Sequence, residues 1–299
     1  NGQISSVALM DARSIAATAA NKGYLTSATD LADIEYTHPK YFFDKAIYDR
    51  RVYNGVGKAD PSVEIKFGPN IKDWPEMVPL TDNLLLKVAS VIHDPVTTTD
   101  ELIPSGETSS YRSNPLGLAE FTLSRKDPEY VGRAKAIQAV EKVREAGECM
   151  GKAFSEVKEV MHAIKEKFED VCGSNTGVGS TIYAVKPGDG SAREQAASCQ
   201  KVLGGWANIA KEYATKRYRS NLINWGMLPF VIDKDFDFDN DDYVFIPGVK
   251  DAVKNKTEVI KAYVVNKNFA EIELRLGELT DDERQIITDG CLINYYKYN

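Results

Sequence analysis

The distribution of apolar residues along the chain predicts short strands and helices in succession. Residues 84–91 form a short apolar run typical of a buried strand, and residues 181–185 are β-branched and aromatic. Between these two segments, apolar residues recur every three or four positions from 135 to 171, with lysine and glutamate in between. This spacing predicts one long or two consecutive amphipathic helices, broken near residues 147–151. Further strands are predicted at 242–246, 262–265 and 271–276.

The two ends of the chain carry helix signals. Small and apolar residues spaced along Ile4–Ala20 predict an amphipathic helix, and a shorter helix is expected within residues 41–52. Near the other end, Thr280 precedes a glutamate by three positions, which is typical of a helix start, and Gly290 is a suitable stop. Residues 30–80 are rich in proline, aspartate, lysine and aromatic residues with weak periodicity. They are interpreted as a long connector.

Composition and charge narrow the functional classes. The chain has 299 residues, of which 43% are hydrophobic, enough for one large or two ordinary domains. The formal net charge is -7 and the basic residues are scattered, so nothing in the composition favours nucleic acid or an anionic membrane surface. No apolar run approaches the roughly 20 residues of a spanning helix, and no signal-peptide order is present at the N-terminus. We expect a cytoplasmic protein without a membrane segment.

The cysteines give no metal-binding pattern. Four are present, widely spaced and without a C-x-x-C pair: Cys149, Cys172, Cys199 and Cys291. This spacing argues against a zinc ribbon or an iron–sulfur site made within this chain. We interpret the four residues as small hydrophobic side chains in a reducing compartment, and we expect no metal site in the chain.

Two further loops look like ligand-binding motifs but fail the spacing tests. The glycine-rich segment at 173–180 has no closing lysine and precedes a strand, whereas a phosphate-binding loop follows one. The acidic segment at 233–242 offers no frame with glycine at the sixth position and glutamate at the twelfth. The first is interpreted as a turn and the second as a solvated loop.

Candidate chemistry is concentrated between residues 186 and 197, after a predicted strand and before an alanine-rich helix. Gly188 and Gly190 permit a tight turn. Ser191 falls where an N-cap or first-turn hydroxyl would lie among unpaired amide groups, and Arg193 adds a planar set of donors suited to a carboxylate. The pattern fits an ordinary capped helix after a glycine turn. It also fits an anion site.

Three segments resemble one family in the same order along the chain. Residues 190–197 are similar to the Gly-Ser-Ser-Arg-Glu-His-Ala motif in the swivelling domain of the aconitase and isopropylmalate dehydratase superfamily. Residues 93–114 look like the family segment that ends in a substrate-binding arginine, here Arg112. Residues 219–230 resemble the family pattern R-x-N-L-x-x-x-G-x-L-P. The resemblance implies an α/β fold, the aconitase-type swivelling β/β/α domain with a long helical insertion, preceded by a connector and a remnant of the upstream domain.

The resemblance also implies a division of the chain. Residues 1–29 would be the end of the upstream, cluster-bearing domain, 30–80 the connector, and 81–299 the swivelling domain. The abrupt start without a methionine suggests a C-terminal piece of a longer protein. In relatives a substrate-binding arginine follows a glycine near this junction, whereas here Gly2 is followed by Gln3.

The family reaction is the reversible removal of water across adjacent carbons of a hydroxy di- or tricarboxylic acid. The resemblance implies that Ser191 is the base, that Arg193 acts in the same turn, and that Arg112 binds a substrate carboxylate. Gly190 and Ala192 would line the substrate-binding turn. A [4Fe-4S] cluster, which polarises the departing hydroxyl, is expected in the missing upstream domains and not in this fragment. The expected partners are therefore the small-molecule hydroxy-polycarboxylate substrate and those domains, and the fragment alone is expected to be inactive.

Three positions depart from the family pattern. Ala192 replaces the second serine of the motif, Gln195 replaces the usual histidine, and Glu101 stands where many relatives carry histidine. These changes indicate a divergent branch whose substrate need not be citrate. The alternative is a non-catalytic module of the same fold that binds RNA or protein. The acidic balance disfavours RNA, and salt-sensitive gel-shift binding would support it.

Overall fold

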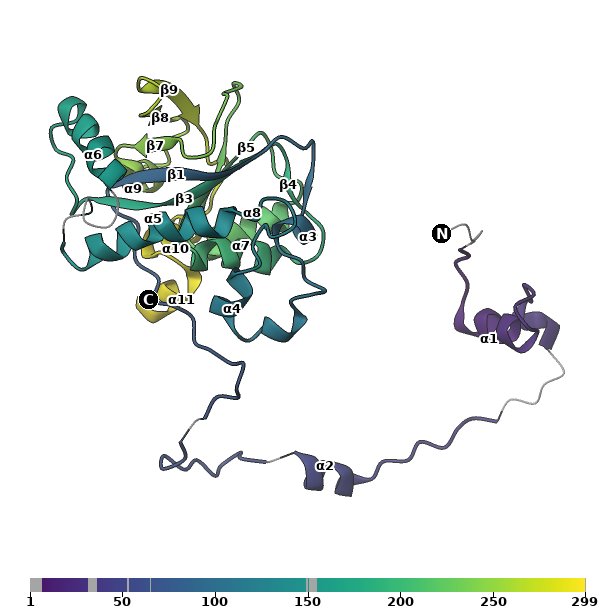
Figure 1. Cartoon of the computed structure of the whole chain (residues 1–299). Helices are drawn as coiled ribbons and strands as arrows, with labels where there is room; N and C mark the ends of the chain where they lie inside the picture. The colour runs from purple at the N-terminus through teal and green to yellow at the C-terminus, as the bar shows by residue number, and fades with distance from the viewer. Residues whose placement is uncertain are drawn as a thin grey trace. The chain divides into compact units, whose positions relative to one another are not determined.

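The computed structural model describes residues 7–31, 37–52, 54–64, 66–148, 150 and 155–298 (Figure 1). The chain divides into two units, Asn1–Ile65 and Lys66–Asn299, and each is described by itself. No helix within these described ranges is long and apolar enough to cross a bilayer.

The first unit contains short helices that begin at aspartate caps. Helix α1 (Ala12–Ala20) starts at Asp11, whose carboxylate accepts hydrogen bonds from the backbone amides of Arg13 and Ser14. Helix α2 (Lys45–Arg51) starts in the same way at Asp44. Between them lies the 3-10 turn η1 (Ala28–Leu31). Helix α1 is shorter than predicted, because residues 7–11 are not helical, and Ile4, where it was expected to begin, lies outside the described residues. Helix α2 is also shorter than the predicted range of 41–52. Most apolar side chains described in this unit are exposed.

The second unit is built on a seven-stranded mixed sheet with the order β6-β5-β3-β1-β7-β8-β9. The strands are β1 (Asn83–Ile92), β3 (Thr176–Ala184), β5 (Gly205–Ala210), β6 (Leu228–Val231), β7 (Tyr243–Ile246), β8 (Ile260–Val264) and β9 (Ala270–Leu274). From β6 to β1 the neighbours are parallel, and from β1 to β9 they are antiparallel. The predicted α/β class is confirmed.

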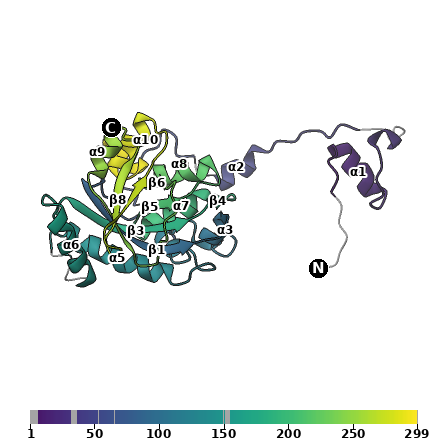
Figure 2. The same cartoon turned by 90° about the horizontal axis from the view of Figure 1, so that it is seen from above.

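Helices cover both faces of this sheet (Figures 1 and 2). They are α3 (Thr99–Leu102), α4 (Pro115–Ala119), α5 (Tyr130–Glu145), α6 (Ser155–Lys167), α7 (Arg193–Val202), α8 (Lys216–Asn224), α9 (Val249–Lys254), α10 (Asp281–Asp289) and α11 (Leu292–Tyr298), with a 3-10 turn η2 (Ser109–Tyr111). Leu84 and Leu86 of β1 share a core cluster with α9, whereas Leu85 packs with α5 and α6. Burial on both faces explains why apolar residues occupy successive positions of β1, as at residues 84–86.

Most elements predicted from periodicity are present. The amphipathic segment at 135–171 forms two helices, α5 and α6, and not one long helix. This is the second of the two arrangements that the sequence predicts. The strand predicted at 181–185 begins earlier, because residues 176–180, assigned to a turn, already belong to β3. Helix α4 begins after Asn114, whose side chain caps it, and ends at Ala119.

A small second sheet ties two loops together beyond the parallel strands. Strand β2 (Thr97–Thr98) follows β1, β4 (Pro187–Asp189) follows β3, and the two pair in parallel. The amide of Thr97 donates to the carbonyl of Lys186 at 3.0 Å. Because both loops leave the carboxyl ends of adjacent parallel strands, this pairing fixes the edge of the sheet where ligands bind in open α/β folds.

The segment at 219–230 has a structural role. The Arg219 guanidinium donates to the carbonyls of Leu276 and Glu278 at 2.7 and 2.8 Å. Gly226 has a φ of 66°, and a Cβ there would lie 2.0 Å from the carbonyl oxygen of Gly290. These contacts hold α8 and β6 against the C-terminal part of the unit.

Candidate functional site

A cavity of about 230 Å³ lies beside the β2–β4 pair, and it joins two of the three segments singled out in the sequence. The lining residues are Ile103, Ser105, Thr108, Arg112, Leu118, Ser191, Ala192 and Gln195. Among the predicted site residues, the cavity brings together Arg112, Ser191 and Ala192. Gly190 and Arg193 do not line it.

Ser191 opens onto this cavity and does not cap the helix. The N-cap of α7 is Ala192, which has φ -83° and ψ 43° and no side-chain capping bond. The prediction that Ser191 supplies an N-cap or first-turn hydroxyl is therefore wrong, because the turn ends one residue later and places an alanine at the cap. The Ser191 side chain is exposed, and Ala192 at the N-cap has no side-chain oxygen that could accept from the first-turn amides of α7.

Glycine is required in the turn that presents Ser191. Gly188 and Gly190 have φ values of 98° and 132°, which other residues rarely adopt. A Cβ on Gly190 would lie 2.2 Å from Oγ1 of Thr99, and one on Gly188 would lie 2.3 Å from the Tyr218 ring. The turn is thus pressed between α3 and α8, and Gly190 positions its neighbours without lining the cavity.

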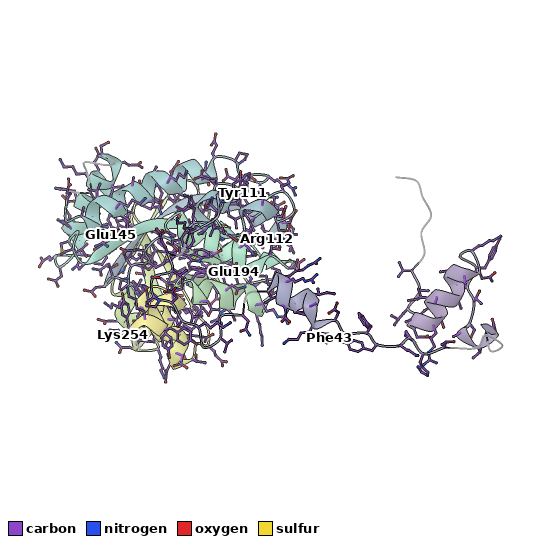
Figure 3. The ribbon with its side chains drawn as sticks, turned by 90° about the horizontal axis from the view of Figure 1, so that it is seen from below. Phe43, Tyr111, Arg112, Glu145, Glu194 and Lys254 are labelled. Atoms are coloured by element: carbon purple, nitrogen blue, oxygen red, sulfur yellow. The ribbon has the colours of Figure 1, made fainter. Side chains whose placement is uncertain are left out.

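Arg112 reaches the cavity from the loop after η2. Its side chain is exposed and forms no ion pair with any residue in the described ranges. The backbone around it is held firmly: the Tyr111 ring packs against Phe121 with centroids 5.2 Å apart, and Asn114 caps α4. Figure 3 shows Tyr111 and Arg112 in this loop, on the same side of the unit as Glu194. The guanidinium is therefore positioned by its backbone and left open to a ligand.

Arg193 is the first residue of α7, and its side chain is half-buried. Its Nε is buried and has no hydrogen-bond acceptor in the part of the chain that the structure describes. An unsatisfied donor of a charged group is costly, so an incoming anion that accepts from it would relieve that cost.

Acidic side chains near the cavity are occupied elsewhere. Glu101 caps α3 by accepting from the amide and hydroxyl of Thr98, and it also accepts from Lys126 at 3.3 Å. Burial opposes ionisation of Glu101, but the hydrogen bonds from Thr98 and Lys126 outweigh burial and lower its pKa. Glu194 accepts from the indole of Trp225 at 3.1 Å. Arg112 is consequently the only charged residue among those described as lining the cavity.

The chain shows no match to a metal or cluster site within the described ranges. No group of three or more histidine, cysteine, aspartate or glutamate side chains could hold a metal ion there. Cys172 is half-buried, Cys199 and Cys291 are buried, and all three are free; Cys149 lies outside the described residues. Burial raises the pKa of the Cys199 thiol to about 12, so this sulfur is a poor metal ligand. These residues do not fit an iron–sulfur cluster.

Comparison with known families identifies the part of the chain that carries the serine turn. Residues 163–235 match the model of the aconitase C-terminal domain. This part of the chain is therefore similar to an aconitase C-terminal domain. The matched residues include Ser191, Arg193 and Gln195, whereas Arg112 precedes the match.

Two relatives of the aconitase domain extend the comparison. Aconitate hydratase A of Rickettsia bellii (strain RML369-C) is 30% identical over 131 residues, which are 41% of this chain and 15% of that protein. The matched stretch therefore spans a small part of the hydratase. The crystal structure of 3-isopropylmalate dehydratase from Methanocaldococcus jannaschii is 24% identical, covers 72% of this chain and 93% of its own, and has a TM-score of 0.43.

Several lining residues carry no signal in the sequence. Thr108 is buried, and its hydroxyl donates to the carbonyl of Pro104 at 2.9 Å, which holds the loop against the cavity. Ser105 donates its backbone amide to Asp100 at 3.1 Å. Both are loop residues that follow α3 and lie within the family-like segment at 93–114, but no role was assigned to either from the sequence.

Proposed function

We propose that this chain is the C-terminal part of an aconitase-like hydro-lyase acting on hydroxy di- or tricarboxylic acids, with Ser191 as the base. The observation that supports it most is that Ser191 and Arg112, from two separate segments, line one cavity. The aconitase-domain match over residues 163–235 supports the same reaction class.

The base role follows from the electrostatics of the turn. A serine hydroxyl accepts a carbon-bound proton only as an alkoxide, which requires strong positive potential. Three sources are proposed: the amides at the start of α7, where the N-cap Ala192 has no side-chain cap, the Arg112 guanidinium, which lines the same cavity as Ser191, and Arg193 two residues further along the chain. In the proposed step the proton moves from the substrate carbon to Oγ of Ser191.

Substrate binding is assigned to the two arginines. Arg112 would hold one carboxylate from the loop side of the cavity. Arg193 does not line the cavity, and its proposed role toward a second carboxylate rests on the resemblance of residues 190–197 to the family motif. Two guanidinium groups suit a substrate with two or three carboxylates. Ala192 leaves room where the family motif has a hydroxyl, and the Gln195 amide can donate to a carboxylate or hydroxyl. These two residues support a substrate other than citrate.

The cavity would form one half of the active site. The residues that the structure describes do not fit an iron–sulfur cluster, so the proposal assigns the cluster to upstream domains. The assembled enzyme is proposed to be cytoplasmic. The 299-residue chain alone is expected to show no turnover.

The test joins this chain to its cluster-bearing domains and assays a panel of hydroxy-polycarboxylates. Replacing Ser191→Ala should lower kcat about 10²–10⁴-fold, the usual contribution of a positioned acid or base. The thermal midpoint should stay unchanged, because the Ser191 side chain is exposed.

Ser113→Ala provides a matched control, since Ser113 is exposed and does not line the cavity. This variant should retain full activity. Equal turnover in wild type and Ser191→Ala would refute the base assignment. Turnover by the isolated chain without added iron would refute the division of the site between domains.

A further inference from the structure

A second cavity lies at the other end of α7, around a buried lysine. Lys201 is 6% exposed, and its Nζ has no hydrogen-bond partner among the described residues. The ammonium lies over the Trp206 ring, 3.7 Å from the ring centroid. The cavity has a volume of about 140 Å³ and contacts α5, α7 and the segment at 75–78. None of its described lining residues belongs to the Ser191 cavity.

The ammonium of Lys201 lacks an acceptor because the nearest buried carboxylate is already used. Glu141 accepts two hydrogen bonds from Arg144, both at 2.7 Å, and one from the amide of Val178 at 2.8 Å. Burial lowers the pKa of Lys201 to about 8, so the side chain remains largely protonated at neutral pH. The Trp206 face compensates for part of the lost hydration. The remaining donors point to a missing acceptor, because an unpaired buried charge is costly.

The mouth of this cavity has the opposite charge. Glu76 and Glu145 are exposed lining residues, and neither forms an ion pair in the described ranges. Burial and the nearby carboxylates of Glu141 and Glu76 raise the pKa of Glu145, and the neighbouring cations Arg144 and Lys142 offset only part of this rise. A cationic group at the mouth would relieve this repulsion. Lys142 is also at the mouth but is exposed to solvent. Figure 3 shows Glu145 on the side of the unit away from Arg112.

We propose that this cavity binds a small zwitterion, namely an α-amino acid with a short side chain. Its carboxylate would accept from Nζ of Lys201, its ammonium would face Glu145 and Glu76, and its apolar part would contact Trp206 and Val202. The charge pattern discriminates between ligand classes. A ligand with only a carboxylate is repelled by Glu76 and Glu145 at the mouth of the cavity. A ligand with only an ammonium group is repelled by Lys201 inside it. The site stands apart from the hydro-lyase proposal and does not depend on it.

The first test titrates the full 299-residue chain with three probes that differ by one group: L-alanine, propionate and ethylamine. Binding measured by NMR or calorimetry should be saturable for alanine and at least tenfold weaker for the other two. Propionate binding as tight as alanine would overturn the proposal, because the acidic mouth would then have no role.

Variants locate the site. Lys201→Met keeps the aliphatic stem and removes the charge, and it should weaken alanine binding at least tenfold. Glu145→Gln should weaken it severalfold. Lys135→Met is the matched control, since this exposed lysine of the same helix α5 does not line the cavity, and it should leave alanine binding unchanged. Loss of binding in Lys135→Met but not in Lys201→Met would overturn the assignment.

A measurement on the wild-type chain avoids any effect of substitution on folding. In protein labelled at the lysine ε-carbon, one resonance should titrate with a pKa near that of Lys201, about 8. Saturating alanine should raise this pKa, because a bound carboxylate favours the charged form, and propionate at the same concentration should not. An unchanged pKa at saturating alanine would overturn the proposal.

Discussion

Within the part of the chain that the structure describes, each end of α7 carries a cationic nitrogen atom without a hydrogen-bond partner, but the two settings differ. At the N-terminal end, Arg193 and the exposed Arg112 stand beside an uncapped helix start. At the C-terminal end, the single ammonium of Lys201 is buried over an aromatic ring. The helix dipole attracts an anion directly at the first end, whereas at the second end it favours the lysine charge itself.

This difference separates two ways of preparing a site for a carboxylate. At the N-terminal end the Arg112 guanidinium is exposed and remains hydrated until a ligand arrives, so it costs the fold little, and only Nε of Arg193 is buried. The C-terminal end stores a dehydrated charge, which costs stability in the empty protein. Side-chain changes at the N-terminal end of α7 should therefore alter activity with little effect on the free energy of unfolding. Changes at the C-terminal end should alter the free energy of unfolding with little effect on activity.

The largest expected effect concerns Arg112. In the protein joined to its cluster domains, Arg112→Ala should lower kcat/KM about 10²–10³-fold, since truncating one partner of a charge-assisted hydrogen bond costs about 2–5 kcal/mol. The free energy of unfolding should change by less than about 0.5 kcal/mol, because the side chain is exposed and unpaired within the described residues. Steady-state kinetics and urea unfolding measure the two quantities.

Arg125→Ala is the matched control for Arg112. Arg125 lies on the same loop region but pairs with Asp100 at 2.7 Å and Glu107 at 2.6 Å, and it does not line the cavity. Its kcat/KM should stay within about threefold of wild type. A similar loss of activity in both variants would show that general positive charge, and not the position of Arg112, is responsible.

The next effect concerns Lys201 and pH. The pKa of Lys201 is about 8 in the folded protein and 10.5 in the unfolded chain. Between pH 8 and pH 10.5 the unfolded chain therefore holds a proton that the folded protein has lost. Stability should therefore rise with pH, by about 2 kcal/mol between pH 8 and pH 10. Buried Tyr130 and Tyr218 have raised pKa values and act in the opposite direction above pH 10, which sets the upper limit of this window.

Urea unfolding at several pH values checks this contribution. Lys201→Met should be more stable than wild type at pH 7, and the difference should shrink as the pH rises to 10. A constant difference across this range would show that Lys201 is solvated in the folded protein, and the contrast between the two ends of α7 would be lost.

The smallest effect concerns the turn before α7. Gly190→Ala should destabilise the unit by about 1–3 kcal/mol, because its φ is 132° and its new Cβ would overlap Oγ1 of Thr99. Adding Thr99→Ala should recover only the part due to the overlap. Gly106→Ala, where a Cβ would have no neighbour within 4 Å, should be nearly neutral. Equal destabilisation by Gly106→Ala would remove the special role of this turn.

The sequence predicted those helices and strands whose defining interactions join residues only a few positions apart. Thr280 and Glu283 form the predicted capping box of α10, and Gly290 ends this helix with a φ of 95°. The apolar run at 84–91 is the central strand β1. In these cases the interactions that define the element connect neighbours in sequence, so pattern and structure agree.

Interactions between distant residues could not be predicted in this way. Strands β2 and β4 are two and three residues long, too short for a periodic signal, and they exist because their loops meet. The rule that serine is preferred over alanine at an N-cap placed Ser191 wrongly, because the glycine turn sets where α7 begins. The meeting of Ser191 with Arg112 was expected from family resemblance and not from spacing.

Lys201 shows the same limit for burial. A lysine in the last turn of a helix is typically exposed to solvent. The packing of α7 against α5 and β5 encloses Lys201 beside Trp206.

The pairing of β2 with β4 has a consequence for motion. Thr97 and Thr98 lead into α3 and the Arg112 loop, while Pro187 and Asp189 lead into the serine turn. Rupture of this short ladder would release both loops together, so their amide protons should exchange with solvent in one concerted opening event. The proposed base Ser191 and the carboxylate-binding Arg112 would then move apart, or return to their positions in the cavity, in a single step.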